Sequence, residues 1–219
     1  MQQKQQTLKQ SLTFTGRGLH TGLQVEMAIE PAPVNHGVKF QRVDLPEQPI
    51  IEAIADNVTA TSRGTTLEKN NVKISTIEHV LAALSGMGVD NALVKVDAPE
   101  APIMDGSARL YVEGIIETGV EEQNEDRWYF EIKEKFVYRD EAFGKEITLL
   151  PDDKFSMEVM IDYNSEVIGN QYARMNDVSE FATGIAPCRT FVFLHELEPL
   201  FKNNLIKGGD LDNAIVIVE

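Results

Sequence analysis

The sequence is short of cysteine, of long apolar runs and of positive charge. Its 219 residues include a single cysteine, Cys188, so an intrachain disulfide is excluded. No apolar run approaches the roughly 18 residues that a membrane helix needs, and the N-terminus, MQQKQQTLKQ, lacks the apolar core of a signal peptide. We therefore expect a cytoplasmic protein with no integral membrane segment.

The scarcity of positive charge bears on the choice of partner. There are 20 Lys and Arg residues against 35 Asp and Glu, which gives a formal net charge of −15. Such a surface repels phosphate backbones, so no nucleic acid is expected as a partner. Apolar residues make up 42% of the chain, enough for packed cores, and the length fits one large domain or two small ones.

Alternation of apolar and polar residues predicts many strands and few helices. In Leu23–Ile29 and in Phe155–Ile161 the odd positions are apolar, as in half-buried strands. Strands are also predicted over Val38–Val43, Leu93–Val96, Trp128–Glu134, Glu146–Leu150 and Ala214–Val218, and helices over Thr76–Met87, Leu110–Thr118 and His195–Lys202. This mixture predicts an α+β fold in which helices pack on sheets.

The chain shows signs of two domains and of an internal repeat. The polar stretch Glu121–Arg127 has no apolar residue and is typical of a linker, which predicts domains at 1–124 and 125–219. Asp90–Val96 resembles Asp212–Val218, and each segment follows a helix and a glycine turn; the alternatives are a duplication and a coincidence between short segments. The second copy stops in mid-strand at Glu219. We expect two similar two-layer domains, the second truncated, in an N-terminal fragment of a longer protein.

The pair Glu78-His79 has two interpretations. Ser75 and Glu78 have the spacing of a capping box, so Glu78 can be a helix cap alone. At about 100° per residue, the helix wheel puts His79 opposite an apolar stripe and beside small residues. Such a face suits close approach by another domain or by a substrate. The apolar stripe comprises Ile77, Val80, Leu81, Leu84 and Met87, and the small residues are Ala82, Ala83 and Gly86.

A metal bound to His79 would place Glu78 beside a metal-bound water. Catalytic zinc has three protein ligands and an open position for water, whose proton a nearby carboxylate can accept. The chain has four histidines but neither an HExxH motif nor a His-x-x-x-Asp pair. Taken alone, the residues leave the metal site incomplete.

Two loop segments also stand out. Gly16–Gly22 is rich in glycine and carries Arg17 and His20; a hairpin turn explains it better than a phosphate cradle, because no strand–loop–helix order follows. Pro102–Ala108 is expected to be a loop in which Ser107 caps the next helix.

Four motifs together indicate a family. They are Gly18–Gly22, Ser75–His79, Pro102–Ser107 and Arg189–Phe191, in this order along nearly the whole chain. Each is weak alone, but the set resembles the UDP-3-O-acyl-N-acetylglucosamine deacetylases, which perform the committed step of lipid A biosynthesis in Gram-negative bacteria. The resemblance implies a zinc-dependent amide hydrolase that releases acetate from the 2-acetamido group of this UDP-linked substrate.

The resemblance also implies a fold and a set of roles. Two similar domains would enclose the active site between them. Zinc would be bound by His79 and by the histidine and aspartate of a later His-x-x-x-Asp motif, with Glu78 as the general base. Thr190 would donate to the oxyanion, Phe191 would lie by the substrate, and His20 would lie near the site.

The chain differs from the family in lacking two of its later motifs. It ends before the His-x-x-x-Asp motif and before the general-acid histidine of the family. We therefore expect the isolated chain to bind zinc poorly and to have almost no activity. In some relatives a hydroxyacyl-carrier-protein dehydratase is fused to the deacetylase, so the full-length protein could include that domain. The competing hypothesis is a non-catalytic binding or scaffold module of related fold.

Overall fold

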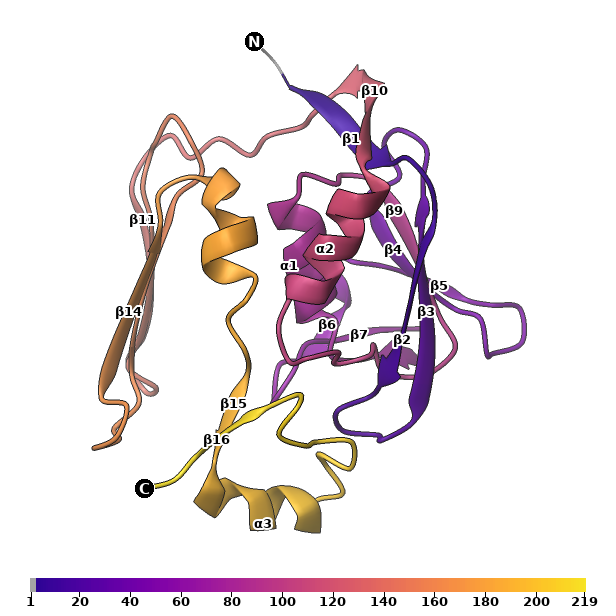
Figure 1. Cartoon of the computed structure of the whole chain (residues 1–219). Coiled ribbons are helices and arrows are strands. Elements are labelled where there is room, and N and C mark those ends of the chain that lie inside the picture. The colour runs from indigo at the N-terminus through magenta and orange to yellow at the C-terminus, as the bar shows by residue number, and fades with distance from the viewer. Residues whose placement is uncertain (1–2) are drawn as a thin grey trace.

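The computed structural model describes residues 3–219 of the chain, and residues 4–126 fold into a two-layer unit. Its elements are β1 (Lys4–Leu8), β2 (Leu12–Arg17), β3 (Gln24–Pro31), β4 (Val38–Arg42), β5 (Ile50–Glu52), η1 (Ala55–Asn57), β6 (Val58–Ala60), β7 (Thr66–Lys69), β8 (Val72–Ile74), α1 (Glu78–Gly86), β9 (Ala92–Val96), α2 (Arg109–Thr118) and β10 (Val120–Asp126). A five-stranded sheet has the order β2-β3-β9-β4-β5, and α1 and α2 cover one face of it (Figure 1). The predicted α+β class is confirmed.

The core of this unit lies between the sheet and its two helices. Val25, Met27 and Ile29 alternate with exposed or half-buried residues along β3, as the apolar pattern predicted, and all three are fully buried. The central strand β9 pairs antiparallel with β3 and parallel with β4. The helix predicted over Thr76–Met87 forms as α1, with Val80 and Leu84 in the core.

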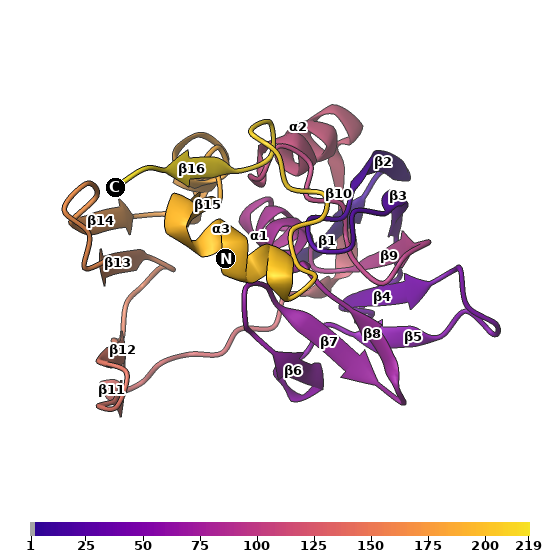
Figure 2. The same ribbon diagram turned by 90° about the horizontal axis from the view of Figure 1, so that it is seen from below.

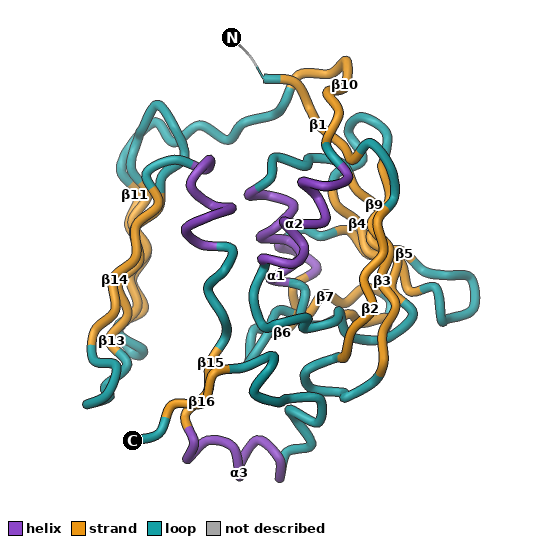
Figure 3. The backbone as a smooth tube through the Cα atoms, viewed as in Figure 1, coloured by secondary structure: helices purple, strands orange, loops and turns teal. Residues whose placement is uncertain are grey.

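The remaining elements belong to the second half of the chain. They are β11 (Phe136–Asp140), β12 (Lys145–Leu149), β13 (Met157–Asp162), β14 (Asn170–Met175), η2 (Val178–Glu180), η3 (Phe181–Ile185), β15 (Phe191–Phe193), α3 (Leu194–Lys202) and β16 (Ile215–Ile217). β11–β12 and β13–β14 are antiparallel hairpins that form a layer apart from α1 and α2 (Figure 3). Their apolar side chains are largely exposed, including Phe136, Tyr138 and Ile147.

A short βαβ unit completes the described chain. β15 leads into α3, and β16 returns to pair in parallel with β15 (Figure 2). The Asn91 and Asn213 side chains, at matching points of the proposed repeat, are both buried. Each precedes a strand with a parallel partner, β4 beside β9 and β15 beside β16. The two segments are therefore similar in local structure as well as in sequence, whereas duplication of the whole domain stays a prediction.

The small-residue face of α1 is covered by η3. A Cβ atom built on Gly86 would lie 2.1 Å from Cδ1 of the Phe181 ring. Phe181 and Ala186 are buried in the same core cluster as Ala83 of α1. The close approach that the helix wheel predicted thus occurs on this face, and the partner is a segment of the second half of this chain.

The linker interpretation of Glu121–Arg127 is wrong. Val120–Asp126 is strand β10, which pairs antiparallel with β1. A strand at the edge of the fold can be polar on both faces, because its backbone is satisfied by its neighbour and its side chains meet water. The point between residues 124 and 125 lies inside this strand, and the division into domains there stays a prediction.

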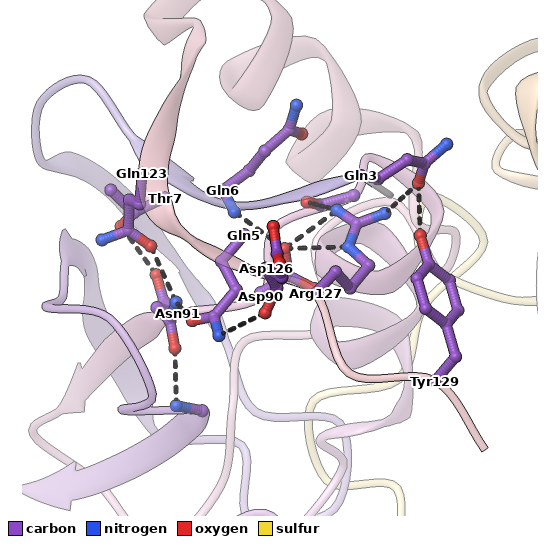
Figure 4. A network of polar contacts seen from close by, with 12 residues as sticks. Gln3, Gln5, Gln6, Thr7, Asp90, Asn91, Gln123, Asp126, Arg127 and Tyr129 are labelled. Carbon is purple, nitrogen blue, oxygen red and sulfur yellow. Dashed lines mark hydrogen bonds and ion pairs between the residues drawn. The ribbon is translucent and has the colours of Figure 1, made fainter. Parts of the chain in front are cut away.

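Polar side chains fasten β1 and β10 to the turn after α1 (Figure 4). Arg127 forms an ion pair with Asp90 at 2.9 Å and donates to the Gly88 carbonyl at 2.8 Å. Asn91 donates to Gln5 and to Gln123 at 2.8 and 2.7 Å. The segment that composition marked as a linker is therefore fixed to the first unit.

The strand predicted over Trp128–Glu134 is also wrong. This segment has no regular structure, and the strand begins at Phe136. Trp128 is 87% exposed and Phe130 91% exposed. Aromatic residues favour a strand only where a partner strand and a packing surface are present, and neither is found beside this segment in residues 3–219.

No helix in residues 3–219 is long and apolar enough to cross a membrane.

Candidate active site

Glu78 is the first residue of α1, and a loop of the first unit holds its side chain. The backbone N–H of Thr65 donates to Oε2 of Glu78 at 2.9 Å. The predicted capping box is absent, because α1 has no side-chain cap and the Ser75 hydroxyl donates to the Pro99 carbonyl instead, at 3.3 Å. The carboxylate is thus oriented by the segment before β7 rather than by its own helix.

Glu78 is half-buried, and Gly64 lies beside its second oxygen. A Cβ on Gly64 would lie 3.4 Å from Oε1, which is an ordinary van der Waals contact. Thr65 is the only hydrogen-bond donor to the carboxylate among the residues that the structure describes. Oε1 can therefore accept a hydrogen bond from a water molecule, as a general base requires.

His79 is half-buried beside two carboxylates. Burial lowers its pKa below the ordinary 6.5, and the negative charges of Glu78 and Asp105 partly oppose that shift. Burial tends to raise the pKa of Asp105, but hydrogen bonds from Ser107 and Arg109 lower it overall. The imidazole therefore favours its neutral form, in which a ring nitrogen has a free lone pair.

The loop Pro102–Ser107 connects His79 with the second half of the chain. The Tyr111 hydroxyl donates to the Pro102 carbonyl, and Nε of Arg189 donates to the Asp105 carbonyl at 2.7 Å. The Thr190 N–H donates to the Gly106 carbonyl at 2.7 Å. Gly106 has φ +82°, and a Cβ there would lie 2.0 Å from the Asn213 carbonyl oxygen, so this approach requires glycine.

Ser107 lies one residue before the N-cap of α2, which is Ala108 and not Ser107 as the sequence predicted. Its hydroxyl accepts the N–H of Arg109, the first residue of the helix, at 3.1 Å. The same hydroxyl donates to Oδ1 of Asp105 at 2.7 Å. The loop is therefore tied at its end as well as at Pro102.

Three of the predicted site residues line one cavity. His20, Thr190 and Phe191 face a cavity of about 260 Å³ whose other walls are mostly apolar. Those walls include Leu197 and Leu200 of α3 and Val216 of β16. Glu78 and His79 are not part of its lining. The five predicted residues therefore form two groups, three residues around the cavity and two at the start of α1.

His20 lies in the turn between β2 and β3, as the hairpin interpretation of Gly16–Gly22 predicted. Its Nδ1 accepts the Ile206 N–H at 3.4 Å, and its Nε2 lies 3.0 Å from the Arg63 carbonyl oxygen. Both contacts fit the neutral tautomer with its proton on Nε2. His20 thereby connects the loop that reaches Glu78 with the segment after α3.

An ion pair joins the same loop to α3. Arg63 donates to both carboxylate oxygens of Glu196. The Arg63 guanidinium lowers the pKa of the Glu196 carboxyl, which is partly shielded from solvent. The wall of the cavity and the loop beside Glu78 are therefore mechanically connected.

A complete metal site is not present in residues 3–219. No group of three or more His, Cys, Asp or Glu side chains there is arranged to hold a metal ion. Catalytic zinc takes three protein ligands, so the donor set around His79 does not fit that requirement by itself.

Sequence reasoning missed Glu100. Its side chain is completely buried and accepts hydrogen bonds from the His20 loop and from Thr76. The signal was a lone charged residue inside the apolar run Ala98-Pro99-Glu100-Ala101-Pro102. Charged residues are seldom fully buried without partners, so this position could have been marked from the sequence.

Comparison with known proteins agrees with these motifs. The family model for LpxC, UDP-3-O-acyl N-acetylglycosamine deacetylase, matches residues 5–219. The bifunctional enzyme LpxC/FabZ of Bacteroides thetaiotaomicron is 53% identical over 216 residues, covering 99% of this chain and 47% of the relative. That of Porphyromonas gingivalis is 51% identical over 217 residues, with 99% and 47% covered.

A relative with a single function in its name is also similar. The UDP-3-O-acyl-N-acetylglucosamine deacetylase of Teredinibacter turnerae is 43% identical over 217 residues, covering 98% of this chain and 71% of the relative. The chain thus spans about half the length of the two bifunctional relatives. On the match over residues 5–219, it belongs to the UDP-3-O-acyl N-acetylglycosamine deacetylase family.

Proposed function

We propose that the protein containing this chain hydrolyses the 2-acetamido group of UDP-3-O-acyl-N-acetylglucosamine to acetate and a free amine, the committed step of lipid A biosynthesis. The observation that carries the proposal is the Glu78 carboxylate at the start of α1. One of its oxygens is fixed by the Thr65 N–H at 2.9 Å, and the other accepts no hydrogen bond from the described residues. Membership of the deacetylase family supports the choice of substrate.

Each residue has a proposed task in the hydrolysis. Glu78 accepts a proton from the attacking water, and the proton is later needed by the departing amine. The Thr190 hydroxyl donates to the carbonyl oxygen as negative charge develops on it, an interaction typically worth about 10²–10³ in rate. Phe191 and His20 contact the substrate in the cavity, whose apolar walls suit an acyl chain.

His79 is the one zinc ligand that we assign to this chain. Its half-buried imidazole favours the neutral form that binds metal. The donor set in residues 3–219 is incomplete, so no step of the reaction is assigned to the metal. By the family resemblance, the other ligands would lie later in the full-length protein.

The bifunctional relatives suggest a further part of the whole protein. Both are named LpxC/FabZ and are about twice as long as this chain. By this likeness the full-length protein would also include a hydroxyacyl-carrier-protein dehydratase. The cytoplasmic location and the lack of a nucleic-acid partner remain predictions from composition.

An assay of the full-length protein tests the proposal. Purified protein is incubated with UDP-3-O-acyl-N-acetylglucosamine, and released acetate and the product amine are quantified by mass spectrometry. Equal amounts of the two products, formed with turnover, are expected. Binding of the substrate without any product would favour the alternative, a binding or scaffold module of related fold.

A further inference from the structure

Glu100 is a buried carboxylate that joins two parts of the site. Its side chain is 0% exposed, and its partners in the described part of the chain are neutral donors. Oε1 accepts the His20 N–H at 2.9 Å and the Thr76 hydroxyl at 2.8 Å. Oε2 accepts the Thr21 N–H and the Thr21 hydroxyl, both at 2.8 Å. A buried charge is retained only where such donors replace its lost hydration.

The first of these parts is the turn that carries His20. A Cβ on Gly18 would lie 2.5 Å from Oε2 of Glu100 and 2.4 Å from the Thr21 hydroxyl oxygen, so only glycine allows this approach. The carboxylate thereby fixes the backbone on which His20 faces the cavity. This turn is 80 residues from Glu100 in the sequence.

The second part is the segment that enters α1. Thr76 has φ +56°, a left-handed conformation that a β-branched residue rarely adopts. Such a conformation persists only where the surroundings enforce it. The Thr76 hydroxyl donates to Glu100, and the backbone of Ser75 pairs with that of Pro99 and Ala101 through two hydrogen bonds of 3.0 Å. Glu78 follows two residues later.

We propose that Glu100 is a positioning residue for the deacetylation, which acts on Glu78 through Thr76 and on His20 through Thr21. This inference rests on the proposed function. The carboxylate holds the direction in which the chain enters α1, and so the placement of the Glu78 side chain. Through the same group, the cavity wall and the general base keep one relative position.

Substitution by glutamine removes the charge at constant shape. Each oxygen of Glu100 accepts a backbone N–H, so either orientation of the introduced side-chain amide sets its NH₂ group against a donor. Glu100→Gln is therefore expected to lower kcat by about 10- to 100-fold. The matched control is Glu117→Gln on the exposed face of α2, which should keep the parent kcat.

Three further variants test the Thr76 contact and the Thr21 contact of Glu100 separately. Thr76→Val keeps the β-branched shape but removes the hydroxyl, and it should lower kcat about tenfold at nearly constant KM. Thr76→Ser restores the hydroxyl and should recover most of the kcat. Thr21→Val acts on the His20 turn, and it should raise KM more than it lowers kcat. A purely structural role for Glu100 would lower the Tm of Glu100→Gln, Thr76→Val and Thr21→Val without this division between kcat and KM.

A second readout does not depend on activity. The amide resonance of Thr65 reports the position of the Glu78 carboxylate that it contacts. In the full protein labelled with ¹⁵N, Glu100→Gln and Thr76→Val should shift this resonance, while Glu117→Gln and Thr76→Ser should leave it close to the parent value. An unshifted Thr65 resonance in folded Glu100→Gln, or parent kcat and KM in that variant, would overturn the proposal.

The two readouts distinguish the failure of this inference from that of the proposed function. If the parent protein shows no deacetylation, the proposed function fails, and the Thr65 resonance still tests the role of Glu100. If Glu100→Gln does not fold, the pair Thr76→Val and Thr76→Ser carries the same test through the other end of the hydrogen bond.

Discussion

The Thr65 N–H donates to one oxygen of the Glu78 carboxylate at 2.9 Å, across 13 residues of sequence. The contact explains why a residue at a helix start does not cap its own helix. It orients the carboxylate through one oxygen, and the second oxygen accepts no hydrogen bond from residues 3–219. Because Glu78 contacts the Thr65 N–H and does not cap α1, its carboxylate has no role in capping that helix. This supports the proposal that Glu78 is a general base.

Packing between the two halves of the chain depends on Gly86. A Cβ at this position would lie 2.1 Å from the Phe181 ring. Gly86→Ala should therefore lower the free energy of unfolding by about 1–3 kcal/mol, measured by urea denaturation. The matched control is Gly184→Ala within η3, where an added Cβ meets nothing within 4 Å. Equal unfolding midpoints for the two variants would contradict the packing described.

Thr190 provides a test of the oxyanion interaction. Thr190→Val keeps the shape of the side chain but removes its donor, and kcat should fall about 10²–10³-fold. Thr190→Ser retains the hydroxyl and should stay within about tenfold of the parent. Steady-state kinetics on the full protein supply both values. Equal kcat for the valine and serine variants would remove Thr190 from the mechanism.

The environment of His79 predicts a pH dependence of stability in metal-free protein. Burial lowers the pKa of the folded imidazole below the ordinary 6.5, so just below that pH the unfolded state binds more protons. Stability then falls as the pH decreases through this window, because protons favour the unfolded state. His79→Gln removes the group, so the stability of the parent relative to this variant should fall as the pH is lowered.

The measurement is urea unfolding with a chelator present, from about pH 7 to about pH 5. His36→Gln, in the turn before β4, is the matched control for loss of a histidine. If the difference between the parent and His79→Gln is constant over this range, burial does not lower the pKa of His79.

The sequence correctly predicted those elements whose apolar residues recur with the period of a helix or a strand. The ends of α1 lie within two residues of the predicted Thr76–Met87. Its apolar stripe is set by the local sequence, and that stripe faces the core. The same holds for β3 and β9, whose alternating side chains are buried. Five motif residues were expected at one site. The structure groups three of them, His20, Thr190 and Phe191, around one cavity whose lining does not include Glu78 and His79.

The remaining features depend on partners that lie far away in the sequence. The polar strand β10 looks like a linker until β1 pairs with it. Trp128–Glu134 has the composition of a strand but no partner in the described residues. Glu100 is stabilised by donors 24 and about 80 residues away. A local pattern can mark a position such as Glu100 as unusual, but it contains no information on which distant residues will be its partners.

The most direct test of the account is the kcat of Glu78→Gln in the full protein. The glutamine keeps the shape of the side chain but cannot accept the proton of water, so we predict a fall in kcat of about 10²–10⁴-fold at similar KM. Glu117→Gln should match the parent in the same assay. A Glu78→Gln protein that turns over UDP-3-O-acyl-N-acetylglucosamine at the parent rate would contradict the central claim that Glu78 is the general base.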